Sequence, residues 1–239
     1  MRLTTPLIAI LLVASVGRAE QRKATNAPPL VEISPGVFQI GLVRLDKTQK
    51  SVQFPAVLNM DHGLIEYLLV TTRGKTHESL LKTEAEPYHI HVAMLLLGAK
   101  GAAQTQELLK VPTGEYHVNT PGAPTNRLAE LLKGDAIRIE VSQTNKGAQS
   151  VSTPAEDFVL DLQTGKTATR GTWNYNGSRV VDGIYMAQQQ GSIVAMIDDV
   201  DAMVNNPRKG HENDQVWQVR TNLGLKLNDK VLVTFKLGR

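Results

Sequence analysis

The chain of 239 residues contains no cysteine. This absence excludes disulfide bonds, thiolate-ligated iron-sulfur clusters, cysteine-based zinc sites, cysteine nucleophiles and lipidation on an N-terminal cysteine. Aromatic residues are scarce, at 5% of the chain, so any cluster of them is conspicuous. Without cross-links the fold must be held together by ordinary burial, and a hydrophobic content of 41% is sufficient for that.

Recognisable catalytic signatures are missing as well. The chain has no Gly-x-Ser-x-Gly nucleophile elbow. The glycine-bounded turn at residues 98–101 follows a predicted helix, whereas phosphate-binding loops precede one. Lysine and arginine are scattered, which leaves no electrostatic footprint for nucleic acid. We therefore expect no nucleic-acid partner and no nucleophilic or nucleotide-dependent mechanism.

The first 19 residues have the pattern of a cleavable secretory signal. Arg2 supplies a positive start, residues 6–16 are mostly apolar, and Gly17 and Ala19 are small at the expected cleavage positions. The apolar run is about half of the ~20 residues that a membrane-spanning helix needs, so no stable membrane anchor is expected after cleavage. An uncleaved amphipathic helix is the alternative. The pattern predicts a periplasmic or secreted protein.

Cleavage after Ala19 changes the charge balance of the protein. The formal net charge falls from +3 to +1, because Arg2 and Arg18 are removed. The following residues, 20–29, are polar and end in two prolines, which predicts a flexible leader. Residues 30–239 then form the folded part, either as one domain or as two β-rich halves, about 30–134 and 135–239.

Short β-type runs separated by turn signals dominate the folded part. The apolar stretch Leu64–Val70 predicts a central strand, and the dipeptides Asn176-Gly177 and Asp182-Gly183 predict tight hairpins. One helix is predicted over about 86–98, with Pro87 in its first turn and Gly98 after its end. Apolar residues surround this helix, so we expect it to be buried. The predicted fold class is α+β, with mainly antiparallel sheets, one conspicuous buried helix and minor helices.

Three residues are the best candidates for a metal site: His77, Glu78 and His91. Imidazole and carboxylate groups suit zinc, iron or copper, and a strand followed by a helix can bring them together. His89 is about 200° around the helix from His91 and cannot face the same point. The zinc-protease pattern fails, because Leu81 stands where its second histidine would be. The alternative is that these are ordinary core or surface histidines.

Two further groups of residues have ligand-binding chemistry. Trp173 and Tyr175 fall on the same face of a predicted strand, a geometry that can stack on sugar rings or peptides. The alternative is that they cover the edge of the core. Residues 198–214 are rich in Asp and Asn, which suits calcium. The spacing of an EF-hand is absent, so helix capping followed by a polar loop is the favoured interpretation.

Several of these segments together resemble the YdjY-domain family of bacterial proteins. The resemblance spans about Ile40 to the C-terminus, and its most specific parts are Gly74–Leu81, His91–Gly98 and Trp173–Ser178. It implies an exported bacterial protein without an established biochemical role. Some members are labelled ferredoxin-like, but cluster-based electron transfer needs cysteine ligands that this chain lacks.

Three functional hypotheses follow. The leading one is an exported, non-catalytic binding or structural module with no cofactor and with a glycan or protein partner. The second is a metal-dependent enzyme that uses His77, Glu78 and His91 with a divalent metal. The third is glycan or peptide recognition through Trp173 and Tyr175.

Overall fold

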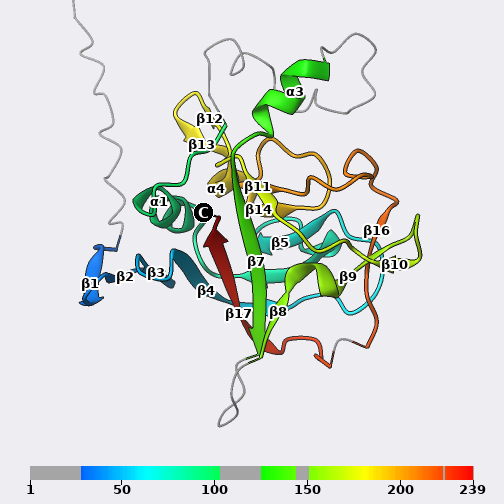
Figure 1. The fold of residues 1–239 in the computed structure, drawn as a ribbon, viewed down its shortest axis with the longest axis horizontal. Coiled ribbons are helices and arrows are strands. Elements are labelled where there is room, and N and C mark those ends of the chain that lie inside the picture. The colour runs from blue at the N-terminus through cyan, green and yellow to red at the C-terminus, as the bar shows by residue number, and fades with distance from the viewer. Residues whose placement is uncertain (1–27, 103–124, 144–150, 223, 239) are drawn as a thin grey trace, which may run out of the picture.

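The computed structural model describes residues 28–102, 125–143, 151–222 and 224–238 (Figure 1). Its main feature is a sheet of eight strands that closes on itself to form a β-barrel. The strands follow each other in the order β4, β17, β7, β11, β15, β14, β5 and β6, and β6 pairs back onto β4. Their bounds are Ser51–Leu58 (β4), Lys230–Leu237 (β17), Asp135–Gln143 (β7), Trp173–Tyr175 (β11), Val204–Asn205 (β15), Ser192–Ala195 (β14), Tyr67–Thr71 (β5) and Ser79–Thr83 (β6).

The predicted α+β class is therefore wrong. The described helices are short: α1 is Pro87–Leu96, α3 is Thr125–Leu131 and α4 is Met186–Gln190, with 3-10 turns η1 at Thr76–Glu78 and η2 at Ala155–Phe158. None of them forms a layer against an open sheet. Each apolar run on the strands has one face to bury, and closing the sheet buries these faces against one another.

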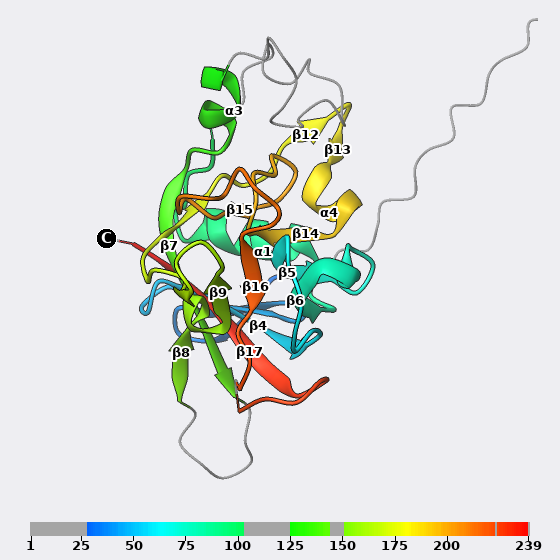
Figure 2. The same ribbon diagram turned by 90° about the vertical axis from the view of Figure 1, so that its right-hand side faces the viewer.

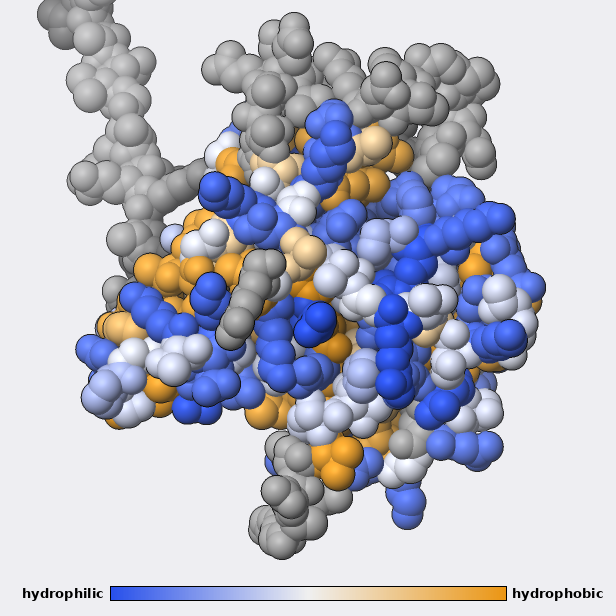
Figure 3. All heavy atoms as spheres, viewed as in Figure 1, coloured by the Kyte–Doolittle hydropathy of each residue, from blue (hydrophilic) through white to orange (hydrophobic). Residues whose placement is uncertain are grey.

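The predicted helix is present at the expected place, but it is not the conspicuous core element we expected. Its ten residues bury one face, while Leu95 and Leu96 remain 51% and 40% exposed. Apolar spheres accordingly gather on the left of Figure 3, where α1 lies. The error arose because apolar residues all round a helix suggest burial on every side, whereas here part of that surface faces outwards.

Strand β4 is the point where the barrel branches. One of its edges pairs with β17 along its length, while the other edge pairs with β3 over residues 51–53 and with β6 over residues 57–58. Pro55 lies between these two stretches, at a position where a missing N–H group is tolerated. Strands β1 (Val31–Ser34), β2 (Val37–Ile40) and β3 (Val43–Asp46) extend outwards from this branch (Figure 1).

On β4 and β7 the buried residues largely follow the period of two expected for strands. On β4 and β17 the inward rings of Phe54 and Phe235 meet edge to face, with centroids 5.3 Å apart. Strand β5 is buried along its whole length and has a partner on each side, as predicted for a central strand. Other fully buried side chains include Val52, Leu58, Leu80, Ile137, Ile139, Val194, Val231 and Val233.

The remaining strands form two small sheets beside the barrel (Figure 2). Strand β9 (Val159–Asp161) lies between β10 (Lys166–Thr167) and β16 (Trp217–Val219), while β12 (Val180–Val181) pairs with β13 (Ile184–Tyr185). The dipeptide Asp182-Gly183 closes this second pair with positive φ at both residues, as predicted. Strand β8 (Ser152–Pro154) pairs with β7. Asn176-Gly177 closes no hairpin, so that prediction is wrong.

Most strand pairings are antiparallel, as predicted, and the pairs β5–β6 and β14–β15 are parallel. The two chain halves each supply a contiguous part of the barrel: β5, β6 and β4 from the first, and β17, β7, β11, β15 and β14 from the second. Among the described residues, no helix has both the length and the apolar character needed to cross a membrane.

The first prediction concerns the closure of the barrel. The Thr83 hydroxyl holds the junction between β4 and β6. It donates to the Pro55 carbonyl (2.5 Å) and accepts from the Ala85 amide (2.9 Å). Thr83→Val keeps the shape but leaves both partners unpaired, so we expect a loss of about 1–3 kcal/mol in unfolding free energy. Urea denaturation measures it. The control, Thr72→Val on an exposed residue, should change it by less than about 0.5 kcal/mol; equal effects would contradict this role for Thr83.

Candidate functional site

The loop between β5 and β6 carries the predicted metal ligands His77 and Glu78, and it builds the first polar cluster. Lys75 lies at the centre of this cluster, with its Nζ 3.4 Å from Glu78 Oε1 and 3.9 Å from Glu66 Oε2. It also donates to the Tyr67 hydroxyl (3.1 Å), which in turn donates to Asp199 Oδ2 (2.9 Å). We call Glu66, Tyr67, Lys75, Glu78 and Asp199 the Lys75 cluster.

Two glycines allow this loop to pack closely on the start of β14. A Cβ on Gly74 would lie 2.9 Å from the Gly191 carbonyl oxygen, and a Cβ on Gly191 would lie 2.3 Å from Thr71 Oγ1. Gly191 also has a positive φ of 73°, and it ends helix α4. The close backbone contact fixes where Lys75 projects, and so it fixes the cluster.

The electrostatics of the Lys75 cluster are set by burial and by the contacts among its members. Burial and the Asp199 carboxylate both raise the pKa of the Tyr67 phenol, so this group stays protonated and cannot act as a base near neutral pH. Burial also raises the pKa of Asp199, and burial together with the Glu78 carboxylate raises the pKa of Glu66. The Lys75 ammonium group already contacts two carboxylates and a phenol. The cluster is a set of mutually satisfied groups.

His77 and His91 have different surroundings. The His77 side chain is 78% exposed, and its Nε2 lies 3.6 Å from Glu78 Oε2. His91 projects from α1 onto the barrel, where its Nδ1 is bonded to the Tyr175 hydroxyl at 2.7 Å and its ring stacks on Tyr175 and lies 5.0 Å from the ring of Tyr185. Burial lowers the pKa of His91, which favours the neutral imidazole. We call His91, Tyr175 and Tyr185 the His91 cluster.

His89 faces a different part of the structure from His91, as the helical geometry predicts. Its ring packs under Gly41, where a Cβ would come within 2.7 Å of Nδ1. Among the described residues, no group of three or more His, Asp or Glu side chains is arranged to hold a metal ion. His77, Glu78 and His91 are therefore not assembled into such a group in this structure.

Trp173 and Tyr175, the residues predicted to stack on a ligand, point into the core, and both are fully buried. Trp173 Nε1 donates to Glu156 Oε1 (3.1 Å), and the Arg208 guanidinium lies over its ring at 4.6 Å. Glu156 also accepts from Arg208 Nη2 and from the Gly171 amide. A ligand could stack on these rings only after the barrel wall had opened.

The Asp- and Asn-rich loop after β14 forms internal hydrogen bonds. Asp199 Oδ1 accepts from the Asp201 amide, and the Asn205 side chain links the Asp199 backbone to Asn176. Asp201 pairs with Arg179 at 2.6 Å. The prediction of helix capping is wrong, because no helix begins at Asp198 or Asp199, and the segment consists mainly of polar loop as predicted.

The same segment contains a histidine–carboxylate pair that sequence analysis missed. His211 Nδ1 lies 2.5 Å from Asp198 Oδ1, and the Asp198 amide donates to the His211 carbonyl (2.9 Å). The hydrogen bond to Asp198 raises the pKa of His211. A histidine held in this way can serve as a general base or a metal ligand, but among the described residues it is not part of a group of three or more such ligands.

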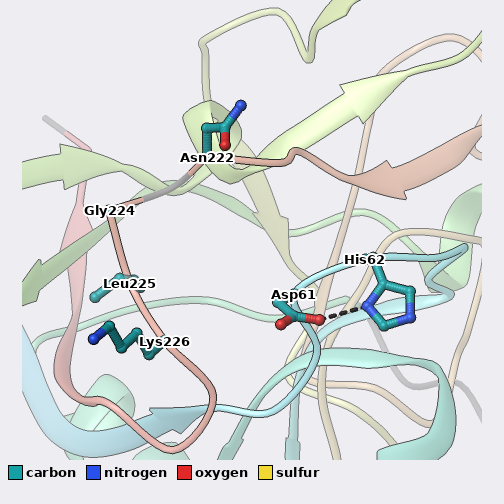
Figure 4. A pocket seen from close by; sticks show the side chains of 6 residues that line it. All are labelled: Asp61, His62, Asn222, Gly224, Leu225 and Lys226. Carbon is teal, nitrogen blue, oxygen red and sulfur yellow. Dashed lines mark hydrogen bonds and ion pairs between the residues drawn. The ribbon is translucent and has the colours of Figure 1, made fainter.

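A surface hollow of about 540 Å³ lies between the loop before Leu64 and the loop before β17 (Figure 4). Asp61 and His62 are bonded to each other on one side, at 2.5 Å. On the other side the side chains of Leu225 and Lys226 extend away from Asp61 (Figure 4). The charged groups of this hollow therefore do not converge on one point. The full lining is Asp61, His62, Asn222, Gly224, Leu225 and Lys226.

Sequence reasoning found Glu78, His91, Trp173 and Tyr175, but it missed most of their partners. Tyr67 and Asp199 are separated by 132 positions, and the guanidinium over Trp173 of β11 comes from Arg208, in the segment before β16. The glycines Gly74 and Gly191 are the one sequence signal that points to the Lys75 cluster. Their close contact, however, becomes visible only in the folded structure.

The fold and the clusters define a small closed-barrel protein in which polar groups brace the loops. The chain belongs to the YdjY domain family: the family model matches residues 43–235, as the resemblance predicted. No curated protein and no solved structure matches the chain.

Trp173 generates the second prediction, because its complete burial assigns it to the core. We expect Trp173→Ala to lower the unfolding free energy by about 3–5 kcal/mol, measured by urea denaturation. The matched control is Tyr88→Ala, on an aromatic residue that is 49% exposed, which should cost less than about 1 kcal/mol. Similar small losses in the two variants would restore the surface-binding interpretation of Trp173.

The two half-buried histidines generate the third prediction. In an NMR pH titration of the histidine rings, we expect His211 to titrate above the ordinary value of about 6.5 and His91 below it. Asp198→Asn removes the charge that stabilises the imidazolium, so the pKa of His211 should fall while that of His91 is unchanged. If His211 already titrates at or below the ordinary value in the unaltered protein, the Asp198 pairing is not formed in solution.

The pKa directions also set the pH dependence of stability. The folded pKa of His211 is raised, so the stability that this group contributes is complete below about pH 6.5 and is lost as the pH rises through the folded value. The folded pKa of His91 is lowered, so its contribution is complete above about pH 6.5 and is lost as the pH falls through the folded value.

Proposed function

We propose that this YdjY-domain protein is an exported, non-catalytic binding module. The observation that carries the proposal is that the side chains with catalytic chemistry are engaged with one another. Lys75 is shared among Tyr67 and two carboxylates, and Glu156 is shared among Arg208, Trp173 and a backbone amide. Such groups hold loops in place, and they are not free to bind and transform a substrate.

The direction of the pKa shifts supports the same proposal. A general base needs a pKa near the working pH and access to the substrate. Tyr67 and Tyr175 have pKa values raised by burial, and the pKa of His91 is lowered while its Nδ1 is occupied. These shifts keep each group neutral near pH 7, which suits packing in a protein interior.

Export rests on sequence alone. The predicted signal, residues 1–19, and most of the leader, residues 20–29, lie outside the described residues. A positive start, an apolar run and small residues at the cleavage position support release into the periplasm or the exterior. We propose that the released protein has no membrane anchor, no nucleic-acid partner and no cofactor.

Two rival functions receive less support from the geometry. A metal-dependent enzyme needs His77, Glu78 and His91 to converge, whereas His91 is bonded to Tyr175 and His77 is exposed beside Glu78. Glycan or peptide stacking needs Trp173 and Tyr175 at the surface, whereas both are buried.

Metal addition and removal test the choice between a binding module and a metalloenzyme, and they form the fourth prediction. A metal present at a hundred times its Kd would stabilise the fold by about 2.7 kcal/mol, equivalent to about 5–10 °C in Tm for a chain of this size. We expect EDTA or added zinc to move the Tm by less than about 1 °C.

A matched variant makes this test specific to the predicted ligands. If zinc raises the Tm of the unaltered protein but not that of the double variant His77→Ala, His91→Ala, the metal-dependent function replaces the one proposed. The same conclusion would follow if the unaltered protein turned over a substrate in the presence of zinc and the double variant did not.

A further inference from the structure

The outer edge of strand β7 has a gap in its pairing. Strand β11 pairs with β7 over residues 135–137, and β8 pairs with the same strand over residues 140–142. Between them, Arg138 and Ile139 pair with β17 on the other edge and have no strand partner on this one among the described residues. The strand pairing of β7 is therefore interrupted between β11 and β8.

A hollow of about 310 Å³ lies at this gap. Its volume is at the lower end of the range for small-molecule sites, about 300–1,000 Å³. Unlike the hollow at Asp61, it lies against the barrel wall and takes residues from strands as well as loops. We call it the Arg138 hollow, and its lining is Arg138, Ile139, Glu140, Pro154, Glu156, Arg170 and Gly171.

The carboxylates around the Arg138 hollow are neutralised by other groups. Glu140 accepts from Lys236 Nζ at 2.7 and 2.8 Å and from Ser152 Oγ at 2.6 Å. Burial by itself would raise the pKa of Glu140, but these hydrogen bonds, together with the charges of Lys236 and Arg138, outweigh it and lower the pKa. Glu156 is held by Arg208. The carboxylates of Glu140 and Glu156 already have cationic partners, so they do not provide a site for a cationic ligand.

The positively charged groups at the Arg138 hollow are paired with acids to a smaller extent. Arg170 forms a two-point pair with Asp157, at 2.8 and 2.6 Å. Arg138 has an exposed side chain, and its charge lowers the pKa of Glu140 without a direct ion pair among the described residues. The lining and the side chains paired with it therefore carry four positive and three negative charges. The excess is a single positive charge, that of the Arg138 guanidinium.

We propose that the Arg138 hollow binds a small organic carboxylate, with the guanidinium of Arg138 as its main anchor. This inference rests on the proposed function, because it names the ligand class of the binding module. A guanidinium matches a carboxylate in planar, two-point geometry. One excess positive charge suits a monoanion better than a phosphate dianion, and the volume admits a body about the size of one sugar ring.

The test is calorimetric titration of the full chain with pairs of probes that differ in their charge. Glucuronate and glucose form one pair, and N-acetylglycine and N-acetylglycinamide form the other, so that sugar acids and amino-acid-like acids are distinguished. We expect at least one acid to bind more than about tenfold more tightly than its neutral partner, as a charge-assisted contact requires. Added salt should weaken this binding.

The variant Arg138→Gln should weaken binding of that acid by about tenfold or more. The matched control is Arg44→Gln, which removes an exposed arginine on β3, a strand that β4 and β17 separate from β7 in the sheet. It should change the affinity by less than about twofold. Both side chains are exposed, and an unchanged Tm in each variant shows that folding is not the cause.

Three results would overturn the inference: no discrimination between acid and neutral probes, equal losses in the two variants, or tighter binding of inorganic phosphate than of either acid. Each of these results is compatible with the proposed function, because a binding module can bind its ligand at another site. Failure of the proposed function would instead appear as turnover or as a zinc-dependent Tm, neither of which depends on Arg138.

Discussion

The short pairing of β6 with β4 is the contact on which the rest of the structure depends. Two residue pairs, Val57 with Lys82 and Leu58 with Leu81, convert an open sheet into a closed one. Closure gives each strand of the barrel two neighbours and turns its apolar faces inwards. Because β4 has only one edge available for both β3 and β6, the sheet must branch there, and Pro55 lies at the branch.

The loops that leave this barrel are held by buried polar contacts. Arg179, which is 2% exposed, meets Asp201 at 2.6 Å, and Arg208 meets Glu156 at a similar depth. A buried pair of this kind adds little net stability by comparison with apolar packing, but losing one partner is costly because a bare charge remains. The polar clusters therefore specify where the loops lie.

Local elements were largely predictable from the sequence, because their signals are local. The helix after Pro87, the hairpin at Asp182-Gly183 and the central strand around Leu68 all follow from spacing and from residues that restrict the backbone. The fold class was not predictable in the same way. An alternating strand pattern is the same whether a sheet closes or stays open, and the strongly apolar helix gave the α+β interpretation too much weight.

The same difference between local signals and long-range contacts applies to the candidate site. The sequence by itself determined which residues are chemically capable, the place of the helix after Pro87 and, through the absence of cysteine, which cysteine-ligated cofactors are excluded. Only the tertiary structure decided that Trp173 and Tyr175 face inwards, that His77 and His91 have separate surroundings, and that Arg138 lies where the pairing of β7 is interrupted. The physical reason is that the fold brings together residues more than a hundred positions apart, such as Tyr67 and Asp199, and no local pattern records such contacts.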